Sequence, residues 1–130
     1  MRLDDTIAAI ATPLQPSGLG VIRISGPQAV PVVEPLFKGG GKKLQKTETH
    51  KLIHGWIHDD GELLDQVLVV VMRAPHSFTT EDVVEIQCHG SPFILRTILT
   101  LVLRQGARLA KAGEFTQRAF LHGRLDLTQV

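Results

Sequence analysis

A nearly continuous apolar run from Leu63 to Met72 constrains the fold of this chain more than any other feature. A second β-compatible segment, Thr49 to His58, precedes it, and the turn sequence Asp59-Asp60-Gly61 lies between the two. Asp and Gly accept positive φ angles more readily than other residues, so they suit the tight turn of a hairpin. The spacing therefore predicts two antiparallel strands joined at Asp59-Asp60-Gly61.

Further β-compatible segments lie on either side of this hairpin. Asp5 to Thr12 and Gly20 to Ser25 are separated by residues 13–18, whose two prolines and glycine cannot continue a strand. Val83 to Cys88 reads as a short strand, and Ala107 to Ala110 as a further candidate. We expect the two N-terminal strands to leave exposed apolar edges, which would favour a homodimer.

One helix is clearly indicated. Ser91 is a good N-cap residue, Pro92 suits the first helical position, and Gly106 stands where a helix normally stops. The apolar residues between them recur at helical spacing, so we predict a helix that begins at Pro92.

A second helix is indicated after Pro27, with Ser25 or Gly26 as its cap, although two internal prolines weaken it. The glycine-rich stretch Lys38 to Lys43 predicts an exposed loop, and Lys111 to Gly123 is broken by glycines. A helix is expected to start near the C-terminal residues 125–130. Because strands and helices do not alternate regularly, the fold class expected is α+β, with a mixed β-sheet and a few packed helices.

The composition fits one globular domain, since 43% of the 130 residues are hydrophobic and 21% are charged. No apolar run approaches the roughly 18 residues that span a bilayer, and acids follow Met1 where a signal peptide would be apolar. A single cysteine, Cys88, suits a reducing compartment, so a cytoplasmic location is expected. The 14 Lys and Arg are nearly balanced by 13 Asp and Glu, which argues against strong autonomous nucleic-acid binding.

Three apparent motifs do not have the residue spacing that their functions require. Residues 39–42, Gly-Gly-Gly-Lys, lack the spacing and the following Ser or Thr of a phosphate loop. Three histidines recur every four residues, at His50, His54 and His58. Along a strand, each would lie roughly 13 Å from the next, which is too far for them to share one metal ion. Cys88 and His89 are adjacent and would point to opposite faces of a strand, so we expect no thiolate-imidazole pair. With these motifs set aside, we expect no catalytic residue and no metal site.

Two charged residues interrupt apolar strands. Glu85 lies among valines and isoleucine, and Arg23 lies within Val-Ile-Arg-Ile. A charge in such a setting is costly unless it is paired or hydrogen-bonded. Two interpretations stay open from the residues alone: Arg23 and Glu85 form a structural ion pair, or they recognise a polar ligand.

Four ordered blocks carry a resemblance, namely residues 5–9, 20–26, 74–85 and the segment Gly113 to Leu127, which is dense in charge, aromatics and glycine. Together they resemble the N-terminal domain of the MnmE (TrmE) family of tRNA-modifying GTPases, over essentially the whole chain. The resemblance implies an α+β fold similar to the tetrahydrofolate-binding domains of one-carbon enzymes. It also implies a homodimer that binds a folate, either 5-formyl- or 5,10-methylene-tetrahydrofolate.

By motif, the family's folate contacts correspond to Arg23 in Gly-Val-Ile-Arg-Ile-Ser-Gly and to Glu85, the last glutamate of Glu-Asp-Val-x-Glu. The third contact is a lysine in Asn-Gly-Lys-Leu-Asp-Leu, where this chain has Arg124. Arginine keeps the charge and changes its geometry. The chain also departs from the family pattern at four other places, which are Thr80 for glycine, Ser91 for glycine, Ala112 for proline and the pair Leu14-Gln15.

The resemblance further implies a role for the folate's one-carbon unit in modifying position 5 of the wobble uridine of tRNA, together with the flavin-dependent partner MnmG (GidA). Residues 1–120 would form the folate-binding and dimerisation domain, and residues 121–130 would begin the connection to a helical domain. The GTPase domain with its GTP, Mg and K sites would lie beyond Val130, so this region is expected not to hydrolyse GTP. The alternative is a dimerisation module whose folate pocket is degraded by Arg124 and Thr80.

Overall fold

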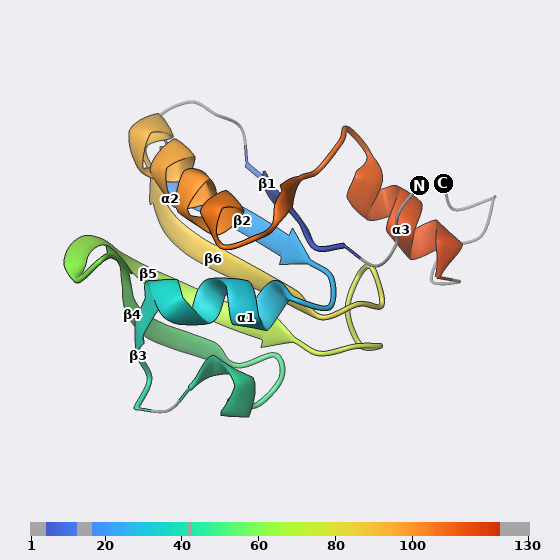
Figure 1. Cartoon of the computed structure of the whole chain (residues 1–130), viewed down its shortest axis with the longest axis horizontal. Coiled ribbons are helices and arrows are strands. Elements are labelled where there is room, and N and C mark those ends of the chain that lie inside the picture. The colour runs from blue at the N-terminus through green and yellow to red at the C-terminus, as the bar shows by residue number, and fades with distance from the viewer. Residues whose placement is uncertain (1–4, 13–16, 42, 123–130) are drawn as a thin grey trace.

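The structure is a computed structural model of the chain, and it describes residues 5–12, 17–41 and 43–122. Seven strands form one sheet, and three α-helices and two 3-10 helices accompany it in the described part of the chain (Figure 1). The strands are β1 (Ile7–Ile10), β2 (Ser17–Ser25), β3 (Phe37–Gly39), β4 (Leu52–Asp59), β5 (Glu62–Met72), β6 (Val83–Gly90) and β7 (Arg108–Leu109). The helices are α1 (Ala29–Val33), η1 (Glu34–Leu36), η2 (Leu44–Lys46), α2 (Pro92–Arg104) and α3 (Glu114–Leu121).

The sheet has the order β3-β4-β5-β6-β2-β1-β7. Its neighbours are antiparallel except for β1 and β7, which are parallel, so the sheet is mixed as the sequence predicts. The β4-β5 hairpin is confirmed, and its turn uses positive φ at Asp60 and Gly61. The α+β class is therefore confirmed.

Helix α2 also matches its prediction. It begins at Pro92, and the Ser91 hydroxyl accepts a hydrogen bond from the Ile94 amide. Gly106, with φ of 116°, follows its C-terminal end, where the left-handed region favours glycine. Its buried residues Leu95, Ile98, Leu101 and Val102 pack on the sheet in the hydrophobic core.

The first helix differs from expectation. Neither Ser25 nor Gly26 caps it: Gln28 is the N-cap residue, without a side-chain cap, and α1 ends after five residues before η1 continues it. The Ser25 hydroxyl instead donates to Glu81 and pairs with the Thr79 hydroxyl. This cap prediction is wrong because Ser25 belongs to β2 and its side chain is engaged elsewhere.

The glycine-rich stretch is not wholly a loop. Phe37–Gly39 forms β3 and pairs with β4, so the prediction of an exposed loop from Lys38 is wrong at its first two residues. A Cβ on Gly39 would lie 2.6 Å from the Gly55 Cα, so glycine permits this close approach of two strands.

Two more points concern the ends of the chain. The glycine-broken stretch contains α3, because Gly113, at φ of 77°, precedes the helix as its N-cap and does not interrupt it. The edge of β1 is covered in part: β7 pairs with Ile7 and Ala8, and the Arg108 and Ala110 amides donate to the carbonyls of Thr6 and Ala8. The dimer expected from exposed strand edges stays a prediction.

The two faces of the sheet differ. Figure 1 shows α1 and α2 together on one face, where they bury the hydrophobic core, and α3 apart from them beyond β1. By strand alternation the opposite face carries a row of directly paired residues, Ala9, Arg23, Glu85, Val70 and Leu52. We call this the open face, because Arg23, Glu85, Val70 and Leu52 are partly or fully exposed there. Within the described residues, no helix is long and apolar enough to cross a membrane.

Candidate functional site

Arg23 and Glu85 meet on the open face. The register of β2 and β6 places them directly opposite each other, and the Arg23 Nε donates to the Glu85 Oε2 at 2.7 Å. The side chains are 33% and 20% exposed, so solvent reaches both members of the pair. Both interpretations of the sequence are thus compatible with the structure: the two charges are paired, and they are also accessible to a ligand.

The pair keeps unused hydrogen-bonding capacity. A guanidinium has five N–H donors and a carboxylate has about four acceptor positions, and one bond links the two groups. Within the described residues, no other hydrogen bond involves the terminal nitrogens of Arg23 or the second oxygen of Glu85. A ligand could therefore bond to both side chains without displacing a buried partner.

The surroundings of the pair suit a flat organic ligand. The Phe115 ring from α3 lies over the Arg23 guanidinium, with 5.6 Å between the ring centroid and Cζ. The small Ala9 and the half-buried Val70 neighbour the pair in the same row. The site therefore combines one aromatic ring, two opposite charges and apolar floor residues.

A shallow pocket of about 220 Å³ lies further along β6 on the open face. Gln87 and His89, which follow Glu85 on the same side of the strand, line it together with Leu19, His54 and other residues. The His89 Nδ1 is 2.6 Å from the Asp65 Oδ1, and Asp65 also accepts from the His89 amide. The surface that starts at Arg23 and Glu85 thus continues into a hollow lined by both apolar and polar residues.

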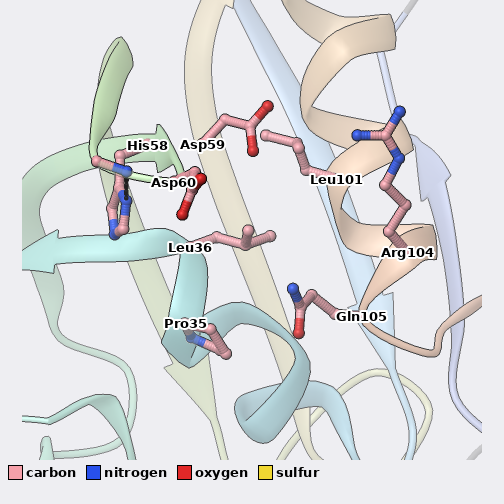
Figure 2. Close-up of a pocket in the computed structure, with 9 residues that line it drawn as sticks. Pro35, Leu36, His58, Asp59, Asp60, Leu101, Arg104 and Gln105 are labelled. Carbon is pink, nitrogen blue, oxygen red and sulfur yellow. Dashed lines mark hydrogen bonds between the residues drawn. The ribbon is translucent and has the colours of Figure 1, made fainter.

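A larger pocket, of about 470 Å³, lies elsewhere. Figure 2 shows Asp59 from the end of β4 and Arg104 from the end of α2 on this pocket, with Leu101 between them and Leu36 below. It contains neither Arg23 nor Glu85, so size alone does not identify the predicted site.

The sequence did not identify a second group of charges, which we call the buried network: Asp5, Glu81, Arg108, Glu114 and Arg118. Arg118 is fully buried. Its guanidinium donates to Glu81 at 3.1 Å, to the Asp5 side chain and backbone carbonyl, and lies 3.5 Å from the Glu114 carboxylate. One arginine therefore joins α3, the start of β1 and the segment before β6.

Arg108 completes this network from the other side. It donates to Glu114 at 2.6 Å and to Asp5 at 2.7 Å. The hydrogen bond from Arg108 is the main cause that lowers the pKa of Asp5 to about 2, and it also lowers the pKa of Glu114. Both carboxylates are therefore held ionised, and reciprocally the pKa of Arg108 is raised.

Only part of this network left a signal in the sequence. Glu114 and Arg118 are four residues apart, a spacing that brings side chains together on a helix, but the helix itself was missed. Glu81 lies in a loop, and nothing local indicates that it meets a residue 37 positions away.

The apparent motifs behave as ordinary structure. His54 is exposed and contacts Gln66, and His50 lies outside the strands, so the histidines do not gather. No group of three metal-ligating side chains occurs within residues 5–12, 17–41 and 43–122. Cys88 is buried and its pKa is raised to about 11 by desolvation, which disfavours the reactive thiolate.

Of the positions that depart from the family pattern, Thr80 is the most informative. Its φ is 64°, in the left-handed region where a β-branched residue is strained and glycine is not. Ser91 caps α2, and Ala112 is exposed. Arg124, the third predicted site residue, and the pair Leu14-Gln15 lie outside the described residues.

A sequence model of the family described as GTP-binding protein TrmE N-terminus matches residues 6–124. The chain is 58% identical to the tRNA modification GTPase MnmE of Moorella thermoacetica, in an alignment that covers 98% of this chain and 28% of that protein. It is 57% identical to the protein of the same name from Syntrophobacter fumaroxidans, over 96% of this chain and 27% of that protein. The chain thus spans little more than a quarter of these relatives, and it belongs to the TrmE N-terminus family.

Proposed function

We propose that this chain is a tetrahydrofolate-binding and homodimerisation domain of a tRNA modification GTPase. The observation that carries the proposal is the Arg23–Glu85 pair: two opposite charges on the open face, partly exposed, with hydrogen-bond donors and acceptors left over. A purely structural pair would gain nothing from this unused capacity. The family resemblance supports the proposal, because the motifs that carry it imply folate contacts at these same two residues.

The chemistry of a pterin complements this pair. The ring presents an N–H beside an exocyclic amino group, and one carboxylate can accept two parallel hydrogen bonds from them. Glu85 suits that role, and its ionised form adds strength to both bonds. Arg23, held beside it, is suited to the pterin carbonyl or to a carboxylate of the glutamyl tail.

The wider role of the protein is part of the same proposal. The relatives named above are tRNA modification GTPases, and this chain aligns with little more than a quarter of their length. In the proposed assembly the domain holds the one-carbon donor, and the protein works with MnmG (GidA) on position 5 of the wobble uridine. The folate supplies the reactivity, and the domain supplies binding and orientation. GTP hydrolysis would belong to the part of the relatives that this chain does not cover.

Calorimetric titration with 5-formyltetrahydrofolate tests folate binding. We expect saturable binding by the unaltered protein and a loss of at least tenfold in affinity for Glu85→Gln, because a buried hydrogen bond to a charged group is worth about 1.5–3 kcal/mol. Glu48→Gln, which alters an exposed carboxylate away from the pair, is the matched control and should bind normally. Absence of heat and of thermal stabilisation at millimolar ligand would exclude the proposal.

The second candidate is a dimerisation module with a degraded folate pocket. The strained Thr80 favours it, because this residue lies in the loop that leads into β6 and Glu85. Sedimentation of the protein across a range of concentrations separates the candidates when combined with the titration. A dimer without folate binding supports the module, whereas a monomer at high concentration excludes the dimerisation part of both.

A further inference from the structure

Helix α3 is attached to the rest of the domain in an unusual way. None of its residues belongs to the hydrophobic core of the described chain, and Ala119 is its only buried apolar residue. Its buried polar residues, Glu114 and Arg118, make the ion pairs of the buried network instead. The orientation of α3 is therefore set by directional hydrogen bonds and ion pairs more than by apolar packing.

Arg118 has the geometry to set that orientation. Its fork of donors reaches Glu81 in the loop before β6 and Asp5 before β1, two segments that are far apart in the sequence. Because guanidinium hydrogen bonds are planar and directional, they restrict rotation of α3 about its own axis as well as its distance from the sheet. Arg118 is fully buried, so it cannot itself touch a ligand.

Phe115 is the residue whose position this rotation controls. It precedes Arg118 by three residues, so the two side chains are neighbours on the helix surface. Its ring lies over the Arg23 guanidinium and is only half-buried. The Phe115 ring thus covers one face of the Arg23 guanidinium, whereas the N–H donors lie in the plane of the guanidinium and are directed away from the ring.

We infer that Phe115 is a further ligand-contacting residue of the Arg23–Glu85 site and that Arg118 is the residue that positions it. The inference rests on the proposed function, since the ligand is the folate. Phe115 forms an aromatic wall that stacks against the folate rings and keeps Arg23 in its bonding orientation before the ligand arrives. The buried network fixes that wall, so it acts on folate affinity without reaching the folate.

A double-mutant cycle with 5-formyltetrahydrofolate titrations tests both parts. Phe115→Ala should raise the dissociation constant about fivefold, the equivalent of about 1 kcal/mol for a partly exposed cation-π or stacking contact. Phe115→Tyr keeps the ring and should bind nearly as the unaltered protein does. Phe120→Ala, on the same helix, is the matched control and should leave the affinity unchanged.

Arg118→Lys keeps the charge and loses the planar fork, so it should raise the dissociation constant by a similar factor. In the Phe115→Ala background the same change should cause no further loss, because the wall it positions is already gone. Melting temperature should fall with Arg118→Lys in both backgrounds, which separates the positioning role from general destabilisation. If Arg118→Lys does not fold, Glu81→Gln replaces it in the cycle.

The outcomes separate this inference from the proposed function. No binding by the unaltered protein overturns both. Normal binding by the unaltered protein and equal binding by Phe115→Ala overturns the role of Phe115 alone. Additive losses from the Phe115 and Arg118 changes would overturn the positioning role, because they would show that Arg118 acts on affinity by another route.

Discussion

Two groups of ion pairs lie near each other in this domain and differ in almost every physical respect. The Arg23–Glu85 pair is partly exposed, is joined by one hydrogen bond and retains unused hydrogen-bond donors and acceptors. Arg118 in the buried network is fully buried and interacts with three carboxylates, two of which also bind Arg108. Accessibility and unused hydrogen-bonding capacity, more than the presence of a charge, therefore distinguish a candidate ligand site from a structural network.

The two groups are also connected. Helix α3 carries Glu114 and Arg118 of the buried network and Phe115 above Arg23. The loop before β6 carries Glu81 of the network and leads directly into the strand of Glu85. Substitutions in the Arg23–Glu85 pair or in the buried network therefore measure how far folate binding and stability depend on separate residues.

The largest effect is expected from Arg118→Met. It would leave buried carboxylates without their partner, and breaking a buried ion pair in this way costs about 3–5 kcal/mol. Urea denaturation should show a correspondingly lower free energy of unfolding. The control is Arg96→Met on the exposed face of α2, which should change it by less than about 0.5 kcal/mol. Similar losses in the two variants would show that the network is not a scaffold.

Acid should weaken the network next. The pKa of Asp5 falls from 3.8 to about 2 in the folded state, so its contribution of about 2 kcal/mol is fully present above the unfolded value and is lost as pH falls through the folded one. The pKa of Glu114 is lowered in the same sense. Stability measured from pH 6 down to pH 2 should fall mainly below about pH 4.5. Asp5→Asn should make this fall shallower, and an unchanged slope would contradict the assignment.

Thr80→Gly should have a smaller effect of opposite sign. Removing the side chain relieves a β-branched residue from the left-handed region, which offsets the greater freedom that glycine has in the unfolded chain and leaves a gain of about 0.5–1 kcal/mol. Thermal unfolding provides the measurement. Thr80→Ala keeps the Cβ and should gain less, so equal gains from the two changes would show that backbone strain is not the cause.

The smallest effect on stability is expected from Arg23→Met. An exposed or half-exposed ion pair is worth about 0–1 kcal/mol, so unfolding by urea should hardly change although folate binding should be lost. A loss of stability as large as that of Arg118→Met would place Arg23 with the structural charges. That result would remove the distinction between the accessible Arg23–Glu85 pair and the structural buried network.

The sequence predicted the parts of this fold that local rules determine. The β4-β5 turn needs residues that accept positive φ, and α2 needs a cap at Ser91 and a stop at Gly106, and these residues are all recognisable in isolation. The predicted cap of the first helix was wrong. Ser25 is a good capping residue by type, but its hydroxyl is hydrogen-bonded to Thr79 and Glu81, which are distant in the sequence. Local chemistry cannot reveal such a competing partner.

The candidate site divides in the same way. Arg23 and Glu85 could be found because a charge inside an apolar strand is conspicuous, and the structure shows that the sheet register pairs them. Phe115 and Arg118 could not be identified from the sequence, because their roles depend on α3 and on partners as many as 113 residues away. The assignment of Arg124 stays a prediction from the family resemblance.

A crystal structure with bound 5-formyltetrahydrofolate would show whether the accessible pair, and not the buried network, contacts the ligand. We predict that the Glu85 carboxylate accepts two hydrogen bonds from the pterin, that Arg23 also bonds to the ligand, and that Arg118 keeps its partners Asp5, Glu81 and Glu114 unchanged. A folate bound elsewhere, with Arg23 and Glu85 still bonded only to each other, would show that this pair is not the ligand site.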